Sequence, residues 1–162
     1  MTKSSRFLSV PRRLWRRRGH GVHSPFAYDF LRRVVAQPYA FYAYPHIDTL
    51  AAQAEVRPAL ARLLYRLCLH VAPHPVAVAG IHAAPLVAIM DAVLPAECPR
   101  PTASPSLLTA TPSIVTLFVN DAVQEALPLW QSMPCGMLFR GSRAAIIIGY
   151  DYLYHQKFDI WI

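Results

Sequence analysis

The chain of 162 residues has few glycines, few charged side chains and few cysteines. Its six glycines leave little material for the glycine-rich loops that bind phosphate groups. Charged residues make up only 15% of the chain and hydrophobic residues 54%, a composition that excludes intrinsic disorder. The length fits about one domain, and the apolar composition predicts exposed hydrophobic surface that could form a homo-oligomer or bind another partner.

The three cysteines, Cys68, Cys98 and Cys135, are odd in number and far apart in the sequence. They provide neither a CxxC zinc motif nor a framework of paired disulfides. We expect them to be reduced and mostly buried, in a cytoplasmic protein. His70 and His74 have helical spacing, but the intervening proline and the lack of a nearby acid predict no metal site.

Acidic residues are absent from the first 28 positions of the chain. Residues 1–33 carry nine Lys or Arg side chains and one acid, whereas the other 129 residues carry seven basic and eight acidic groups. We therefore expect residues 1–18 to form a basic arm that binds nucleic acid, an anionic membrane surface or an acidic protein. The candidate binding residues are Arg12, Arg13, Arg16, Arg17 and Arg18.

Two other interpretations of the basic arm stay open. Its arginines could be solvated or could pair with carboxylates of the same protein. A segment rich in Arg and Ser and free of acids is also typical of a mitochondrial transit peptide.

Residues 67–90 form a run of 24 residues without Lys, Arg, Asp or Glu, which is long enough to cross a bilayer. Pro73, Pro75 and Pro85 would break a helix there and leave carbonyl groups unpaired at membrane depth. We interpret this run as a buried strand and buried helices rather than a membrane span.

The hydrophobic pattern predicts a layered α/β protein. One helix should begin at Ser24 and Pro25 and end before Pro38, with Phe26, Phe30, Leu31 and Val34 on one face. The pattern predicts further helical segments at 47–51, 57–71, 86–94 and 121–131, strands at 76–79, 114–119, 136–139, 144–149 and 158–162, and a proline-rich loop at 95–112. The predicted core includes Leu63, Leu67, Ile114, Val115 and Trp130.

Residues 19–26 read GHGVHSPF, and AYDFLRRVV and FYAYPHIDTL follow. This stretch resembles the start of class I S-adenosylmethionine-dependent methyltransferase-like proteins common in Bacteroidetes. The segment LARLLYRLCLHVAPHPVAVAGI is similar to the arginine-containing helix and first strand of that family. The C-terminal AAIIIGYDYLYHQKFDIWI is similar to its antiparallel sixth and seventh strands, and the matches cover roughly half of the chain.

The resemblance implies a bacterial protein with a small, incomplete Rossmann-like (methyltransferase-type) mixed sheet, flanking helices and an N-terminal helical segment. The basic arm at 1–18 and the helical segment at 19–72 would precede a reduced core at 73–162, which would form one compact unit with 19–72. The resemblance places the S-adenosylmethionine cofactor at Ala79, Gly80, Ile81 and His82. Asn120 and Asp121 end the next predicted strand and should lie beside Gly80, where ligands bind in open α/β sheets.

The loop after the first predicted strand departs from the family pattern. Gly80 matches the first glycine of the family, but the acid before it is missing, and Ala83 and Pro85 occupy later small positions. Residues 99–110 contain no acid for the ribose hydroxyls, since Arg100 is their one charged residue. We therefore expect no saturable S-adenosylmethionine binding in the micromolar range.

Two functions are compatible with these observations. The first is a divergent S-adenosylmethionine-dependent methyltransferase-like protein, which would transfer a methyl group to a small nucleophile if it is active. The second is a non-catalytic Rossmann-like module that binds a partner through its basic arm. The sequence assigns no catalytic residue in either case.

Overall fold

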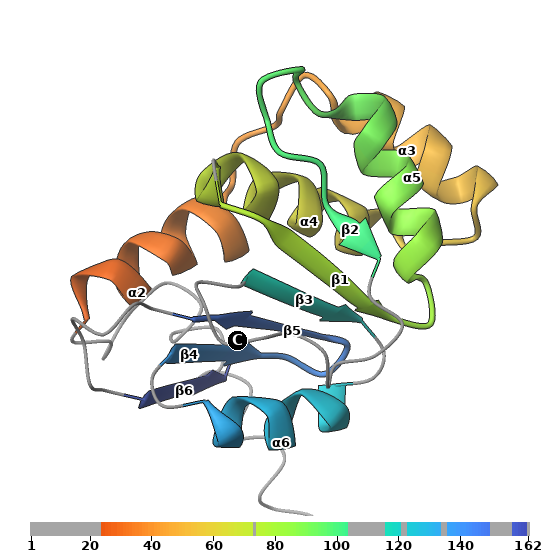
Figure 1. The fold of residues 1–162 in the computed structure, drawn as a ribbon. Coiled ribbons are helices and arrows are strands. Elements are labelled where there is room, and N and C mark those ends of the chain that lie inside the picture. Colours follow the sequence, from red (N-terminus) through yellow and green to blue (C-terminus); the bar gives the residue numbers. More distant parts are fainter. Residues whose placement is uncertain are drawn as a thin grey trace, which may run out of the picture. The chain divides into compact units, whose positions relative to one another are not determined.

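The computed structural model describes residues 24–72, 74–103, 116–120, 123–133, 136–149 and 157–161 (Figure 1). The chain forms two compact units, Met1–Tyr39 with Trp161–Ile162, and Ala40–Ile160. The sequence predicts one compact unit for 19–72 and 73–162; residues 40–72 belong to the larger unit with the core, whereas those up to Tyr39 do not. The physical reason is that the helices between residues 44 and 71 pack against a later helix of the larger unit.

The smaller unit contains helix α2 (Pro25–Phe30) and the π-helical turn η1 (Leu31–Val35), which continues it. Ser24 caps α2 as predicted, because its Oγ accepts a hydrogen bond from the Ala27 amide at 3.3 Å. Three residues of the predicted apolar face, Phe30, Leu31 and Val34, are fully buried. Phe26 is 39% exposed instead, since it lies on the first turn with its ring stacked on that of Phe30.

The larger unit contains helices α3 (Tyr44–Gln53), α4 (Pro58–Val71), α5 (Ala83–Val93) and α6 (Val123–Ser132). Helix α3 is longer than the predicted turn at 47–51, because Pro45 occupies its first turn, where a missing N–H costs nothing. Helix α4 follows its prediction closely, and Leu67 is fully buried. Leu63 is only half-buried, Cys68 is buried as expected, and Tyr65 takes a core position that the sequence pattern did not assign.

The strands are β1 (Val76–Gly80), β2 (Thr102–Ala103), β3 (Thr116–Asn120), β4 (Gly136–Arg140), β5 (Ala144–Ile148) and β6 (Lys157–Trp161). They form one mixed sheet in the order β2-β1-β3-β5-β4-β6. Strand β1 is parallel to β2 and β3, whereas β5 is antiparallel to β3 and β4. The chain is therefore an α/β protein with a mixed sheet, as the sequence predicts.

Strand β2 differs from expectation, since it lies inside the predicted loop 95–112, at the edge of the sheet, where a preceding proline is tolerated. Strands β5 and β6 lie on either side of β4 in the sheet order. The predicted hairpin at 136–149 is confirmed and explains this order: Gly141 N–H donates to the Ala144 carbonyl at 2.8 Å, which closes β4 onto β5.

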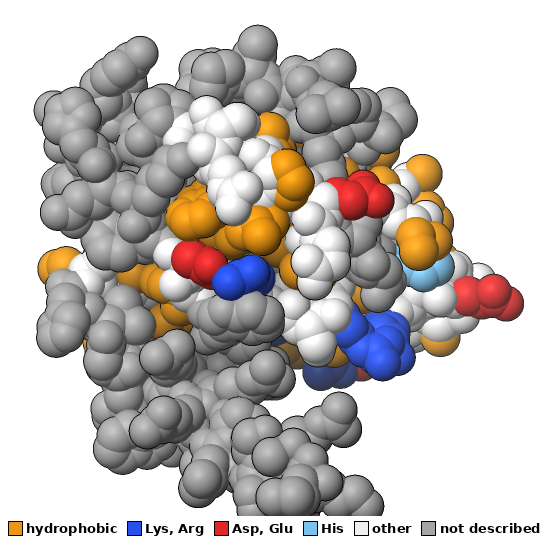
Figure 2. All heavy atoms as spheres, turned by 90° about the horizontal axis from the view of Figure 1, so that it is seen from below, with side chains coloured by type: hydrophobic (Ala, Val, Ile, Leu, Met, Phe, Trp, Pro, Cys, Tyr) orange, Lys and Arg blue, Asp and Glu red, His pale blue; other side chains and the backbone are white. Residues whose placement is uncertain are grey.

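Helices α3, α4 and α5 lie on one side of the sheet and α6 on the other (Figure 1). The core between the sheet and α6 consists of Ala79, Ala126, Leu138, Ala145 and Ile147, with Trp130 half-buried against it. The predicted core residues Ile114 and Val115 lie outside the described residues. Seen from the side of α6, the described surface carries a few charged side chains of both signs among hydrophobic ones (Figure 2).

The uncharged run at 67–90 consists of the end of α4, then β1, then most of α5. The interpretation as separate short elements is confirmed. Within the described part of the chain, no helix has both the length and the apolar character that a membrane crossing requires.

Candidate functional site

The first candidate site is the edge of the sheet where β1 and β3 end. The two strands are parallel, and Gly80 and Asn120 are partners in their register. Asn120 therefore lies beside Gly80, as the strand-end rule predicts. The backbone of Asn120 is placed, but Asp121 lies outside the described residues.

A sharp turn follows β1 at this edge. Gly80 has a φ of +108°, a conformation that a side chain strains, so glycine is needed here for the backbone alone. Ile81 and His82 form the turn, and α5 begins directly afterwards at Ala83. The connection between strand and helix is therefore too short to form a broad glycine-rich loop.

The four predicted cofactor residues of this connection have different surroundings. Ala79 is 3% exposed and packs in the core under α6, so only its backbone could face a ligand. Ile81 is 75% exposed and places an apolar side chain directly after Gly80. His82 is half-buried and takes the N-cap position of α5 without a side-chain cap bond.

The first turn of α5 offers a ligand fewer amides than most helices do. A helix N-terminus normally leaves four N–H groups unsatisfied, and these can bind an anion. Pro85, the third residue of α5, has no N–H group, so this turn has one donor fewer than usual. The Leu86 amide makes the first regular hydrogen bond of the helix, to the His82 carbonyl at 3.0 Å.

Carboxylates that could bind the ribose of a cofactor are also missing from the described part of the edge. Residues 76–90 contain no Asp or Glu, and neither do residues 99–103 around β2. The described part of the edge therefore carries an exposed apolar side chain, Ile81, and no carboxylate, whereas Asp121 and the residues after β2 lie outside the described residues.

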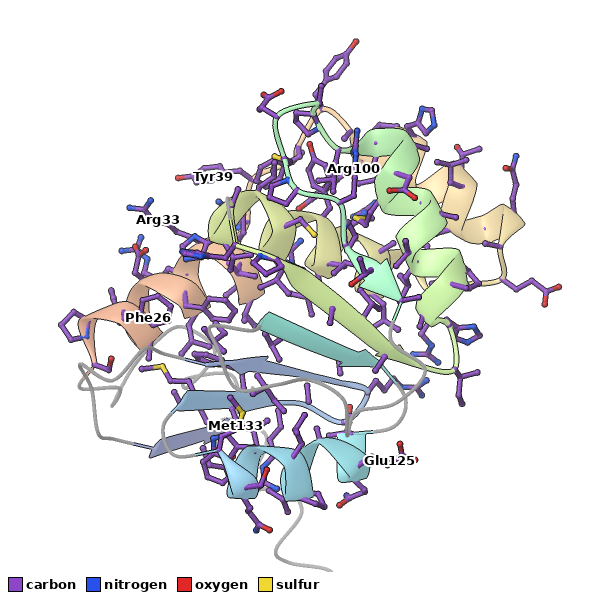
Figure 3. The ribbon with its side chains drawn as sticks, viewed as in Figure 1. Phe26, Arg33, Tyr39, Arg100, Glu125 and Met133 are labelled. Carbon is purple, nitrogen blue, oxygen red and sulfur yellow. The ribbon has the colours of Figure 1, made fainter. Side chains whose placement is uncertain are left out.

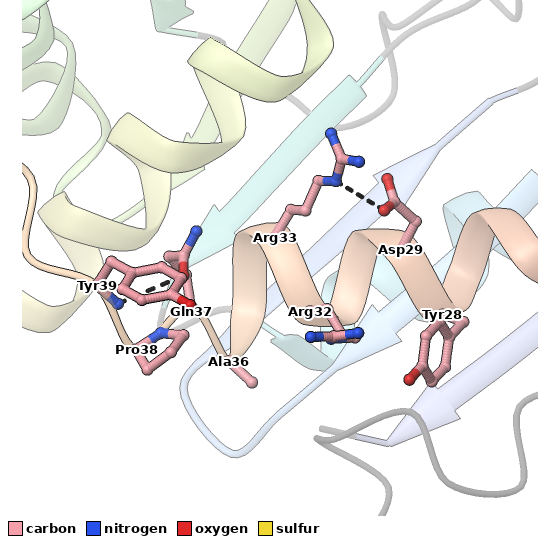
Figure 4. A pocket seen from close by; sticks show the side chains of 8 residues that line it. All are labelled: Tyr28, Asp29, Arg32, Arg33, Ala36, Gln37, Pro38 and Tyr39. Atoms are coloured by element: carbon pink, nitrogen blue, oxygen red, sulfur yellow. Dashed lines mark hydrogen bonds and ion pairs between the residues drawn. The ribbon is translucent and has the colours of Figure 1, made fainter.

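The second candidate site is a groove of about 600 Å³ in the smaller unit (Figure 4). Its lining comes from α2, η1 and the four residues that follow: Tyr28, Asp29, Arg32, Arg33, Ala36, Gln37, Pro38 and Tyr39. Phe26, Arg33 and Tyr39 mark the course of this segment in Figure 3. Sequence reasoning counted Arg32 and Arg33 only as part of the basic N-terminal stretch and missed the groove. The predicted anion-binding residues Arg12, Arg13, Arg16, Arg17 and Arg18 lie outside the described residues.

Metal and thiol chemistry have little support in the described structure. Among the described residues, no cluster of three or more His, Cys, Asp or Glu side chains could hold a metal ion. Cys68 is buried, and burial raises the pKa of its thiol to about 12. Its thiolate, the reactive form, is therefore scarce at neutral pH. Cys98 is a free, half-buried thiol, and Cys135 lies outside the described residues.

Comparisons of the chain with protein-family models, with curated proteins and with solved structures find no match. The function is therefore inferred from two features, the sheet edge at Gly80 and the groove of the smaller unit.

Proposed function

We propose that the chain is a divergent methyltransferase-like protein that binds an anionic partner through its basic N-terminal part. In this proposal it does not bind S-adenosylmethionine with micromolar affinity. One observation carries the proposal: the connection after β1 holds an exposed Ile81 and leads into a helix with Pro85 in its first turn. This connection is where a Rossmann-like protein would bind the cofactor.

The sheet supports the first half of the proposal, the kinship with methyltransferase-like proteins. Strand β1 pairs in parallel with β2 and β3, and α5 connects β1 to β2 along the chain. Strand β5 runs antiparallel within the same sheet. A parallel half with a helical connection and an antiparallel strand further along are both expected from the resemblance.

Energetics supports the loss of cofactor binding. One or two missing hydrogen bonds weaken binding by about 0.5–1.5 kcal/mol each, and a missing charged partner by somewhat more. Because about 1.4 kcal/mol corresponds to a factor of ten in affinity, these deficits weaken a micromolar binder by at least one order of magnitude. The exposed Ile81 side chain next to Gly80 is apolar and offers a cofactor no hydrogen-bonding group.

The charge distribution supports binding of an anionic partner. Residues 1–33 carry a net charge of +8, whereas the remaining 129 residues carry −1. A cationic segment attracts polyanions and strengthens their association at low salt. The positive charge therefore belongs to the N-terminal part of the chain and not to the sheet.

Isothermal calorimetry with S-adenosylmethionine and S-adenosylhomocysteine tests the cofactor half of the proposal on the full chain. We expect no saturation at low-micromolar ligand concentrations, because the weakening derived above moves the dissociation constant to about 10 µM or higher. The double variant Ile81→Gly, Pro85→Ala restores space and one amide donor, and we expect it to bind more tightly than the natural chain. A dissociation constant of a few micromolar for the natural chain would contradict the proposal and favour a working methyltransferase.

A further inference from the structure

The groove of the smaller unit combines aromatic and cationic side chains on one short segment (Figure 4). The described lining residues belong to α2, η1 and the residues up to Tyr39, all within one compact unit. This described lining holds two arginines, one aspartate and two tyrosines, and the Tyr39 side chain is 74% exposed. These are side chains that can bind charged and planar groups at the same time.

The two arginines of the groove have different environments. Arg33 Nε lies 2.7 Å from Asp29 Oδ1, so its charge is matched by a carboxylate. The Arg32 guanidinium lies over the Tyr28 ring, 5.7 Å from its centroid, and makes no ion pair with any described residue. A cation–π contact of this kind holds the guanidinium near the ring face and uses none of its N–H groups, which can still donate to a phosphate. Arg32 is therefore the cation that the groove offers to an anionic ligand.

Tyr39 supplies an exposed aromatic face at the end of the segment. Its side chain is 74% exposed, and that of Tyr28 is 39% exposed. The Tyr39 amide donates to Gln37 Oε1 at 3.4 Å, which ties the turn after η1 to a neighbouring side chain of the groove. A tyrosine that is this exposed contributes little to the core, but its ring can stack on a planar ligand.

The groove is built around the π-helical turn. The Ala36 amide donates to the Leu31 carbonyl at 2.8 Å, across five residues, and Arg32, Arg33 and Ala36 of this region line the groove. Such π-turns are rare and are often found at functional sites. The unusual turn and the groove therefore coincide.

We propose that this groove binds single-stranded nucleic acid, with a phosphate on Arg32 and a base stacked on Tyr39. Arginine beside exposed aromatic rings is the chemistry by which proteins hold single strands without reading their sequence. A free nucleotide would be held in a more enclosed pocket, whereas an open groove suits a continuing strand. The net charge of +8 on residues 1–33, in the same unit, favours a polyanion. The inference rests on the proposed binding function of the N-terminal part and not on the sheet edge.

Fluorescence anisotropy of the full chain with a labelled oligouridylate of about eight nucleotides tests the inference. We expect Tyr39→Ala and Arg32→Gln each to weaken binding about tenfold, and Tyr39→Phe to bind like the natural chain. Arg32→Gln should also lower the slope of log affinity against log salt by about one. Both side chains are exposed, so circular dichroism should show unchanged folding.

Matched controls come from exposed residues outside the groove. Tyr42→Ala removes a fully exposed tyrosine and Arg143→Gln an exposed arginine, and each should change the affinity less than about twofold. Uridine monophosphate should compete only weakly, and equal competition by the mononucleotide would overturn the single-strand assignment.

Two further outcomes separate the inference from the proposed function. If substituting serine for the five arginines at 12, 13 and 16–18 abolishes binding while the groove variants bind normally, the inference fails and the proposed function stands. If the natural chain binds neither the oligonucleotide nor anionic vesicles, both fail.

Discussion

Among the described residues, two glycines hold backbone conformations that other residues rarely adopt; one ends a strand and the other begins one. Gly80 has a φ of +108° at the end of β1. Gly136 has a φ of +148° at the start of β4, and a Cβ atom there would lie 2.9 Å from the Ile148 carbonyl oxygen. Both glycines are required by the fold, so the presence of Gly80 alone does not indicate a cofactor site.

The leucines of α4 test how that helix packs. Leu67 is fully buried, whereas Leu63, one helical turn earlier, is half-buried. We expect Leu67→Ala to lower the free energy of unfolding by about 2–5 kcal/mol, because a buried cavity remains. Leu63→Ala is the matched control and should cost clearly less. Urea denaturation of both variants measures the difference, and a larger loss for Leu63→Ala would show that the helix packs through its other face.

Exposure limits what the sequence can predict at single residues. The pairing of Gly80 with Asn120 follows from the rule that parallel strands end at one edge, and the structure confirms it. The groove does not follow from any such rule. Tyr28 and Tyr39 could equally be core residues by their type, and only the folded chain shows that they are exposed.

At the scale of elements, an ion pair with an aromatic partner joins α3 to α4. Arg62 of α4 forms a two-pronged pair with the Asp48 carboxylate of α3, with Nε donating to Oδ1 at 2.7 Å. The same guanidinium lies over the Tyr44 ring, 4.7 Å from its centroid, and Arg66 Nη1 donates to the Tyr44 hydroxyl at 2.7 Å. The first turn of α3 is therefore bound to α4 by polar groups at its surface.

The ion pair between Arg62 and Asp48 predicts that the stability of the fold depends on pH. The hydrogen bond from Arg62 holds the pKa of Asp48 below its ordinary value. A carboxyl group with a lowered folded-state pKa stabilises the fold above its unfolded pKa of about 4 and loses this contribution as the pH falls through the folded value. We therefore expect Asp48→Asn to lower the melting temperature at neutral pH, with the difference from the natural chain shrinking below about pH 4.

Differential scanning calorimetry over a pH series measures this effect. Glu55→Gln removes an exposed carboxylate shortly after α3 and should leave the melting temperature nearly unchanged at every pH. If the melting temperatures of Asp48→Asn and the natural chain differ by the same amount at neutral and at strongly acidic pH, the ionised Asp48–Arg62 pair is not the source of the difference.

Tertiary contacts that the sequence pattern does not show act at element boundaries. Helix α5 ends at Val93, within one residue of its prediction, and there the Arg100 side chain donates to the carbonyls of Met90 and Leu94 at 3.3 and 3.0 Å (Figure 3). A charged residue seven positions after a helix carries no local signal for this contact. Strand β2 is likewise defined by its pairing with β1 and not by its own two residues. The π-turn η1 reads as ordinary helix in the sequence, since α and π turns place similar residues on one face.

At the scale of the whole molecule, the α/β core and most of the positive charge belong to different units. The larger unit, Ala40–Ile160, contains the layered α/β core, and the smaller unit contains the groove and most of the positive charge. Composition predicted this asymmetry of charge, and the helix and strand pattern predicted the α/β class. The unit boundary at Tyr39 could not be predicted, because it depends on which helices pack together in space.

Nuclear magnetic resonance of the labelled full chain measures binding at both sites in one experiment, through the shifts of their amide signals. We expect S-adenosylmethionine to give the amides of Gly80, Ile81 and Asn120 no shifts that saturate with a dissociation constant below about 10 µM. We expect a single-stranded oligonucleotide to shift the amides of Arg32, Gln37 and Tyr39. Shifts at Gly80 and Asn120 that saturate at a few micromolar S-adenosylmethionine, together with no shifts between residues 28 and 39 on addition of the oligonucleotide, would show instead that the chain binds the cofactor and not a single strand.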